Sequence, residues 1–298
     1  MNKTRLRIGK IPYINIKPIF HMLENEIAPD KYEFVTGYPS ELNRMLKHGE
    51  LDIGPSSSIE YLRDRAIYDY IKGHSISARG PVKSILLISR VPIESLDGQE
   101  IFMTHQSETS VALLKIILEK FYCYNCSYSI TDAPVGDALQ KHSAYLSIGD
   151  EALASVQEAN SVEASAIEAH LIETGGKSTL IETGEKGKHY RVCTINQQAF
   201  YVYDLSELWY ARTGLPFVFA LWTLKKELAK NNPEAVAEFT RDLDAARDLA
   251  MKRLPEISQL PGLALSPKEA LMYWEGMIFT LPDECLRGLE LFSSNLLP

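Results

Sequence analysis

The stretch that decides the fold class is Leu51-Asp52-Ile53-Gly54-Pro55-Ser56-Ser57-Ser58-Ile59-Glu60-Tyr61. Its first part, residues 51–54, predicts a short buried strand, and the hydroxyl side chains of Ser56, Ser57 and Ser58 follow where a helix-like segment opens. The free N–H groups at a helix start carry partial positive charge, and nearby hydroxyl groups complete a site for an anion. A strand that runs into such a segment is typical of an α/β sheet, which binds ligands at the carboxyl ends of its strands.

A second segment, Thr104-His105-Gln106-Ser107-Glu108-Thr109-Ser110-Val111, has the same character. It follows a strand predicted at 99–103 and opens a helix predicted at about 109–121, with Ser107, Thr109 and Ser110 as its hydroxyl groups. Two such segments predict a ligand with two anionic groups. The simpler interpretation, in which both are helix caps that bind nothing, stays open because Ser and Thr are favoured caps in any helix.

The rest of the chain alternates between strand-like and helix-like runs, which indicates the α/β class. Gly49 is expected to end a helix over 41–48 that Ser40 caps, and Ser266 with Glu269 predicts a capping box. Further strands are predicted at 5–11, 83–89, 145–148 and 217–224, and further helices at 16–23, from Pro233 to about residue 254, and after Pro282.

Composition is that of an ordinary globular protein, with 298 residues, of which 45% are hydrophobic, and a mean hydropathy of −0.13. A chain of this length usually folds as two lobes or domains. The net charge is −8 and no Lys/Arg-rich run occurs, so we expect neither a nucleic-acid nor a membrane partner. No secretory pattern and no apolar run of about 18 residues is found, so the expected location is the cytoplasm.

Four cysteines occur, and only Cys123 and Cys126 are close in sequence. One such pair is half of a metal site, and the seven histidines show no ligand spacing. Buried free thiols in a reduced compartment explain the cysteines better. We therefore expect no metal and no other cofactor.

Six motifs stand in order along the chain: Ile11-Pro12-Tyr13-Ile14-Asn15; the stretch 51–61; Ser75-Ile76-Ser77 with Gly80-Pro81-Val82-Lys83-Ser84; Ser107 with Thr109-Ser110; Ile148-Gly149-Asp150-Glu151-Ala152-Leu153; and Thr213-Gly214-Leu215-Pro216-Phe217-Val218-Phe219-Ala220-Leu221-Trp222. Together they resemble the chorismate dehydratase family of the futalosine route to menaquinone. The resemblance covers nearly the whole chain outside residues 154–199.

The resemblance implies a fold similar to the type II periplasmic binding proteins, with two α/β lobes and a central cleft. Lobe one would comprise residues 1–88 and 205–298, and lobe two residues 89–204. The two hydroxyl-rich segments would then face each other across the cleft, one from each lobe.

The resemblance also implies a carbon–oxygen lyase that removes water from chorismate to give 3-[(1-carboxyvinyl)oxy]benzoate. Chorismate carries two carboxylates, in agreement with the two anion sites predicted above. The product is aromatic, so the reaction is downhill, and alignment of the breaking bonds in a closed site accounts for much of the acceleration. The partner that we expect is this small dicarboxylate, and the oligomeric state stays open.

Asn15 is the predicted catalytic contact, because its amide both donates and accepts hydrogen bonds at the end of the first strand. A turn-capping role is the alternative. The predicted substrate-binding residues are Tyr13, Ser56, Ser57, Ser58, Ser77, Arg79, Ser107, Thr109 and Ser110. Glu60 is expected to brace its helix and Asp150 to cap one. His105 has no place in the family pattern. The identity of the general base therefore stays open, and a carboxylate of the substrate could take the proton.

Residues 154–199 depart from the family, where this stretch is shorter; its glycine clusters predict an exposed hairpin, with surface decoration, an oligomer contact or a lid as its possible roles. Two other functions stay open. One is the sister enzyme of the 1,4-dihydroxy-6-naphthoate synthase type, and the other is a non-catalytic binding protein for a small dicarboxylate.

Overall fold

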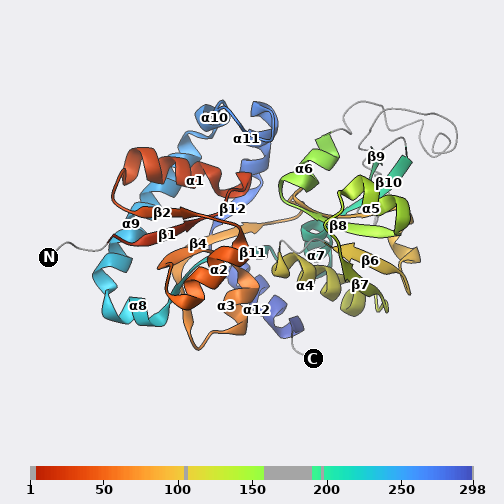
Figure 1. The fold of residues 1–298 in the computed structure, drawn as a ribbon, viewed down its shortest axis with the longest axis horizontal. Helices are drawn as coiled ribbons and strands as arrows, with labels where there is room; N and C mark the ends of the chain where they lie inside the picture. Colours follow the sequence, from red (N-terminus) through yellow and green to blue (C-terminus); the bar gives the residue numbers. More distant parts are fainter. Residues whose placement is uncertain (1–4, 104–106, 158–189, 196–197, 297–298) are drawn as a thin grey trace. The chain divides into compact units, whose positions relative to one another are not determined.

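The computed structural model describes residues 5–103, 107–157, 190–195 and 198–296. The chain divides into two compact units (Figure 1). Unit 1 comprises Met1–Ala78 and Pro216–Ser294, and unit 2 comprises Arg79–Leu215 with the last residues, Asn295–Pro298. The glycine clusters of the predicted hairpin lie in 158–189, outside the described residues.

Unit 1 contains a six-stranded mixed sheet in the order β12-β4-β11-β3-β1-β2. Strand β1 pairs in parallel with both β2 and β3, whereas β11 runs antiparallel to β3 and β4, and β12 antiparallel to β4. The strands are β1 (Arg7–Lys10), β2 (Glu33–Thr36), β3 (Ile53–Ser57), β4 (Tyr68–Ala78), β11 (Phe217–Lys225) and β12 (Met277–Thr280).

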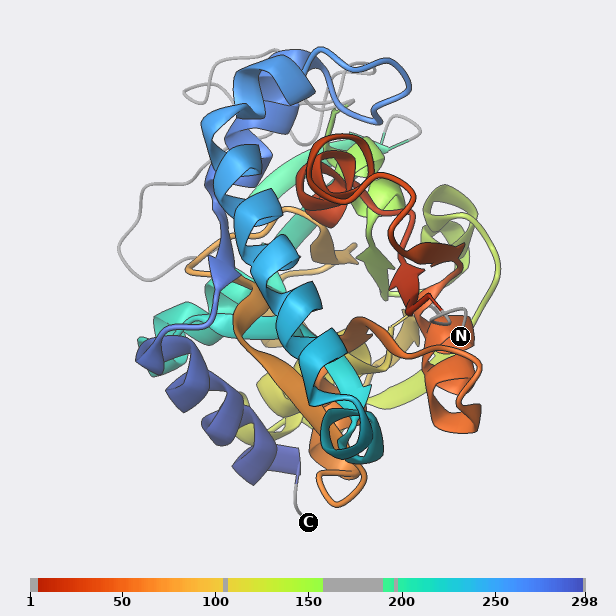
Figure 2. The same ribbon diagram turned by 90° about the vertical axis from the view of Figure 1, so that its left-hand side faces the viewer.

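The helices of unit 1 cover this sheet, and Figure 2 shows the long helix α9 running across it. Helix α9 packs against α1, and the Phe239 ring lies between Tyr32 and Trp222, at centroid distances of 5.2 and 5.7 Å. The helices are η1 (Ile14–Ile16), α1 (Lys17–Met22), η2 (Leu23–Ile27), α2 (Pro39–His48), α3 (Ser58–Arg63), α8 (Lys226–Asn231), α9 (Pro233–Lys252), α10 (Leu254–Ile257), α11 (Pro267–Glu275) and α12 (Asp283–Leu296).

Unit 2 contains a second six-stranded mixed sheet, in the order β7-β6-β8-β5-β10-β9. Strands β6, β7 and β8 are parallel, and β5, β10 and β9 add antiparallel pairs. The elements are β5 (Ile85–Ser89), η3 (Ile93–Ser95), β6 (Glu100–Met103), α4 (Glu108–Lys115), η4 (Ile116–Phe121), β7 (Ser127–Ile130), α5 (Val135–Lys141), β8 (Ala144–Ile148), α6 (Asp150–Gln157), β9 (Arg191–Ile195), β10 (Gln198–Asp204) and α7 (Leu205–Thr213).

The boundaries between the two units differ from the predicted ones. β5 pairs with β8 and β10, so it lies in unit 2, whereas the boundary predicted near residue 88 leaves it in lobe one. Helix α7 likewise contacts β5 and β10 and lies in unit 2, although the second predicted boundary, at 205, assigns it to lobe one. The passages therefore lie about ten residues from both predicted positions, at 78/79 and 215/216.

Several local predictions are confirmed. Gly49 ends α2 with a left-handed φ of 75°, Pro233 opens α9, and Ser266 forms the capping box with Glu269. The predicted cap at Ser40 is wrong, because α2 already begins at Pro39 and Tyr38 precedes it without a side-chain cap. Proline is favoured at the first helical position because it has no N–H group to satisfy.

Cys123, Cys126 and Cys285 are free thiols, as expected, but only Cys285 is buried. Among the described residues, no group of His, Cys, Asp or Glu side chains is arranged to hold a metal ion. None of the helices described is both long and apolar enough to cross a membrane.

A buried histidine joins β4 to α9 in unit 1. His74 has no exposed surface, and its Nε2 lies 3.0 Å from Asp244 Oδ1, which also pairs with Arg247 at 3.0 Å. Its Nδ1 is buried without a hydrogen-bond partner among the described residues. Burial lowers the pKa of His74, the Arg247 charge lowers it further, and Asp244 opposes both. The folded protein therefore holds this ring neutral.

This histidine predicts a pH-dependent stability. Because its pKa is lower when folded than the unfolded value of 6.5, the unfolded chain binds more protons on acidification, and stability falls as the pH drops below about 6.5. The loss is at most about 1.4 kcal/mol per pH unit for one group. We expect His74→Gln to flatten this decline in urea titrations between pH 7.5 and 5, with exposed His48→Gln as control; parallel declines for His74→Gln and wild type would contradict it.

Candidate functional site

Strand direction brings the predicted residues of unit 1 to one edge of its sheet. β1, β2 and β3 are parallel, so their carboxyl ends coincide. The registers Ala220 with Ser57 and Phe217 with Ala78 add the end of β4 to the same edge. This edge, called here the site edge of unit 1, carries Tyr13, Asn15, Ser56, Ser57, Ser58 and Ser77.

Residues 11–16 lead from the end of β1 through the short helix η1 and are called here the Asn15 loop. A buried hydrogen bond holds this loop. Trp274 of α11 has no exposed surface, and its Nε1 donates to the Ile14 carbonyl at 2.7 Å. Ile14 and Ile16 are buried on either side of Asn15, at 4% and 0% exposure. The backbone of residues 14–16 is thus anchored on both sides of the asparagine.

The side chain of Asn15 has an unused acceptor. Its Oδ1 is buried and has no hydrogen-bond partner among the residues that the structure describes. A buried acceptor without a partner destabilises the folded protein by about 1–3 kcal/mol. Such unpaired groups commonly serve to bind a ligand. Asn15 is therefore the group at this edge whose geometry points most directly to a bound molecule.

The three serines at the end of β3 differ in what their hydroxyl groups do. Ser56 lies within β3, opposite Leu221, so it does not open the helix as the sequence pattern predicts. Ser57 is half-buried and precedes α3 without a side-chain cap. The Ser58 hydroxyl donates to the Val218 carbonyl at 2.7 Å, so its proton is used within the fold. The predicted end of the strand at residue 54 is also wrong, since β3 continues through Ser57.

Ser77 and Arg79 stand where the chain leaves β4. Ser77 is fully buried, and its hydroxyl lies 2.7 Å from that of Ser75, which donates to the Thr280 carbonyl at 2.5 Å. Arg79 is exposed and begins unit 2. The hydroxyl of Ser77 takes part in the hydrogen bonds of the sheet, and its contact with a ligand stays a prediction, as does that of Arg79.

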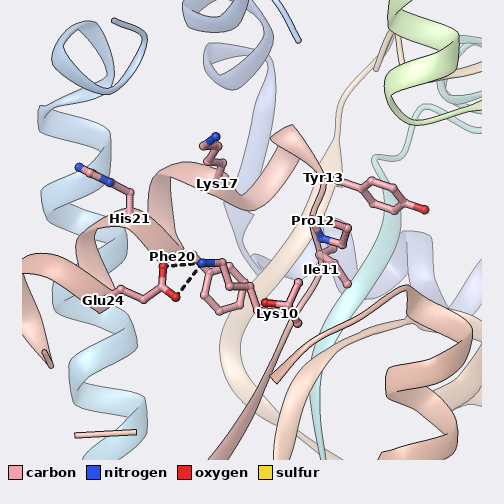
Figure 3. Close-up of a pocket in the computed structure, with 9 residues that line it drawn as sticks. Lys10, Ile11, Pro12, Tyr13, Lys17, Phe20, His21 and Glu24 are labelled. Atoms are coloured by element: carbon pink, nitrogen blue, oxygen red, sulfur yellow. Dashed lines mark hydrogen bonds and ion pairs between the residues drawn. The ribbon is translucent and has the colours of Figure 1, made fainter. Parts of the chain in front are cut away.

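A pocket of about 280 Å³ lies at the carboxyl ends of β1 and β2 (Figure 3). Within it the Lys10 ammonium pairs with Glu24 at 2.6 Å and lies 5.8 Å from the centre of the Phe20 ring. In Figure 3 the ring of Tyr13 points away from the Lys10–Glu24 pair. The lining residues are Lys10, Ile11, Pro12, Tyr13, Lys17, Phe20, His21, Glu24 and Thr36.

The predicted residues of unit 2 also share one edge of their sheet. The parallel strands β6 and β8 end there, and the register of Ile85 with Ile148 places the start of β5 beside the end of β8. This edge, called here the site edge of unit 2, carries loop 79–84, the turn at Gly149 and the start of α4.

Ser107 caps α4. Its hydroxyl accepts from the Ser110 N–H at 3.3 Å and lies 3.0 Å from the Ser110 hydroxyl. Thr109 and Ser110 are buried, at 1% and 2% exposure, whereas Ser107 is half-buried. The capping interpretation is correct for Ser107, and binding of an anion by these three residues stays a prediction. Residues 104–106, including His105, lie outside the described residues.

Sequence reasoning missed Asp204, which holds two segments at this edge. Its Oδ2 accepts from the Lys83 N–H at 2.5 Å, and its Oδ1 accepts from the N–H groups of Ser206 and Glu207 at 3.0 and 3.2 Å. Burial raises the pKa of Asp204 to about 6, although the N–H donors and Arg191 favour the ionised form. Both oxygens accept from N–H groups, which is the hydrogen bonding of a carboxylate. The pattern Asp204-x-x-Glu207 before a helix is a usable signal for it.

The carboxylates next to the motifs contact nearby parts of their own units. Asp150 is the first residue of α6, so it lies within the helix and does not precede it as a cap. Glu60 lies 3.5 Å from the Tyr68 hydroxyl, a weak contact. A third carboxylate, that of Glu151, accepts from Ser147 at 3.1 Å and Tyr145 at 3.3 Å, which fastens α6 to β8.

A family model described as Menaquinone biosynthesis matches residues 6–168 and 193–296. The chain belongs to this family. The matched ranges include every motif quoted above and omit residues 169–192, within the stretch 154–199. A chorismate dehydratase from Thermus thermophilus is 26% identical over 97% of this chain and 94% of its own length.

Solved structures establish the fold. A protein from Archaeoglobus fulgidus superposes with a TM-score of 0.70 at 15% identity, over 99% of this chain and 97% of that one. A Candida albicans gene product described as having the generic periplasmic binding protein fold gives 0.57 at 10% identity, over 97% and 90%. The alkanesulfonate-binding protein SsuA from Xanthomonas axonopodis pv. citri gives 0.54 at 17%, over 100% and 96%. The predicted α/β fold of the type II periplasmic binding proteins is confirmed.

The hydrogen bond from Trp274 predicts a local effect on the Asn15 loop. Trp274→Phe removes the indole donor and leaves the Ile14 carbonyl with only the Lys17 N–H as its partner, at a cost of about 0.5–1.5 kcal/mol for the lost hydrogen bond. We expect the amides of residues 14–17 to exchange hydrogen roughly tenfold faster, measured by mass spectrometry under native conditions. The control Trp209→Phe makes the same substitution at a fully buried tryptophan in α7 of unit 2 and should leave that exchange unchanged. Equal exchange in Trp274→Phe and wild type would show that the indole does not anchor the loop.

Proposed function

We propose that this protein is a chorismate dehydratase, a hydro-lyase that forms 3-[(1-carboxyvinyl)oxy]benzoate for menaquinone biosynthesis. Membership of the menaquinone biosynthesis family and the 26% identity to a protein of that name support the proposal. In this chain the observation that supports it is the buried Oδ1 of Asn15 at the site edge of unit 1, which has no hydrogen-bond partner within the described ranges.

The substrate has two carboxylates, and each unit offers hydroxyl groups at its site edge. We assign one carboxylate to Ser57 and its neighbours and the other to Ser107, Thr109 and Ser110. A hydrogen bond to a charged group contributes about 1.5–3 kcal/mol, compared with about 0.3–1 kcal/mol for an exposed helix terminus, so the hydroxyl and N–H groups dominate the recognition.

The reaction breaks the C–H bond of one ring carbon and the C–O bond of the adjacent one. A base takes the proton, the electron pair of the C–H bond forms the new double bond of the aromatic ring, and the hydroxyl group leaves with a proton as water. Asn15 would accept from or donate to the departing hydroxyl group and hold the C–O bond aligned with the C–H bond. The base that takes the proton is left open between a protein group and a carboxylate of the substrate. No cofactor is required by this balance of atoms.

The test is incubation of the protein with chorismate, with loss of water followed by mass spectrometry. Asn15→Ala should lower kcat by at least about a hundredfold, because it removes a contact to the reacting atoms. Asn43→Ala is the matched control, since Asn43 Oδ1 is also buried without a partner among the described residues but lies in α2. It should retain wild-type turnover within about twofold.

Three outcomes would contradict the proposal. Full turnover by Asn15→Ala would remove this residue from the reaction. Binding of chorismate by the wild type without loss of water would favour a dicarboxylate-binding protein. Conversion of dehypoxanthinylated futalosine in place of chorismate would favour the sister enzyme.

The assignment of a carboxylate to α4 makes a separate prediction. Ser107→Ala should raise KM for chorismate by roughly tenfold, the equivalent of one charge-assisted hydrogen bond, and leave kcat nearly unchanged. Ser266→Ala removes a serine cap of the same kind from α11 and controls for the loss of helix stability. Equal KM values for the two variants in steady-state assays would show that Ser107 is only a cap.

A further inference from the structure

We infer that Asp204 is a positioning residue for the reaction, acting by fixing the loop 79–84 at the site edge of unit 2. The inference rests on the proposed function, because this loop begins with Arg79, a predicted substrate contact. Asp204 itself is 2% exposed and is bonded on both carboxylate oxygens to N–H groups of its own fold.

The two carboxylate oxygens serve different segments. Oδ1 accepts from Ser206 and Glu207, the ordinary arrangement of a helix cap, here at the start of α7. Oδ2 reaches 121 residues back along the chain to the Lys83 N–H at 2.5 Å. A helix cap needs only Oδ1. The bond between Oδ2 and the Lys83 N–H is therefore not part of the cap, and its effect is on the loop.

The loop adopts a conformation that its sequence does not favour. Lys83 has a φ of 63°, in the left-handed region, which costs a residue with a Cβ atom about 1–2 kcal/mol. Such a conformation persists where the surroundings determine it more strongly than the local preference. The hydrogen bond from the Lys83 N–H to the Asp204 carboxylate stabilises this conformation, because a charge-assisted hydrogen bond contributes about 1.5–3 kcal/mol and so offsets the cost of the left-handed φ.

The fixed loop is joined to the next motif at this edge. Immediately after Lys83, the Ser84 carbonyl accepts from the Gly149 N–H at 2.8 Å, at the end of β8. Asp204, the loop and the Gly149 turn therefore form one hydrogen-bonded unit. A displacement of the loop moves the start of β5 relative to the end of β8, and with it the backbone that leads to Arg79.

The variant Asp204→Asn separates the two roles. Its remaining oxygen can accept from Ser206 and Glu207, but its NH₂ group then faces the Lys83 N–H, so two donors oppose each other. Glu207→Gln is the matched control, because it makes the same acid-to-amide change three residues later on α7, where the charge faces Arg191 at 3.8 Å.

We expect two results from Asp204→Asn. The amides of residues 82–84 should exchange hydrogen at least about tenfold faster than in wild type, and kcat/KM for chorismate should fall by at least about tenfold, beyond the change in Glu207→Gln. Thermal unfolding of both variants measures any loss of stability, and assays are run well below the lower midpoint.

Two results would overturn the inference. Unchanged exchange of residues 82–84 would show that Asp204 does not hold the loop. Faster exchange with kcat/KM equal to that of Glu207→Gln would show that the loop position does not serve the reaction. Failure of the proposed function is distinguishable, because the wild type would then show no turnover of chorismate. In that case Asp204 has no role in this reaction, and hydrogen exchange still tests whether it holds the loop.

Discussion

The direction of the strands is the constraint on which both candidate sites depend. Parallel pairing of β1 with β2 and β3, and of β6 with β7 and β8, places carboxyl ends together at one edge of each sheet. Residues as far apart in the chain as Asn15, Ser57 and Ser77 reach the same edge for this reason. The antiparallel strands β11 and β5 complete these edges by starting where the parallel strands end.

Buried hydrogen bonds then decide where the loops on these edges lie. Trp274 anchors the loop of Asn15 in unit 1, and Asp204 anchors the loop of Lys83 in unit 2. In both cases a fully or nearly fully buried side chain forms a hydrogen bond with a backbone group that is distant in sequence, and its loss would remove a contact between that backbone and the core. The loops are thereby positioned by the packed core and do not depend on their own weak preferences.

The fold is shared with binding proteins of other ligands, so the chemistry has to reside in the residues on the edges. Asn15 is distinguished there by an acceptor atom that has no partner in the described part of the chain, whereas the hydroxyl groups of Ser58 and Ser75 donate to backbone carbonyls. A serine-rich motif is thus a mixture of groups that build the sheet and groups that are available to a ligand.

The sequence by itself determined the α/β class, most element positions and the cap at Ser266, because periodicity and capping depend on neighbours within four residues. The resemblance to the family came from its six ordered motifs, and the cap at Ser107 was one of two interpretations that the sequence left open. The tertiary structure decided that Ser56 belongs to a strand, that Ser58 bonds to Val218, and that Asp204 holds Lys83. Those last two pairs of partners lie 160 and 121 residues apart. Contacts over such separations follow from sheet register and core packing, which no local pattern encodes.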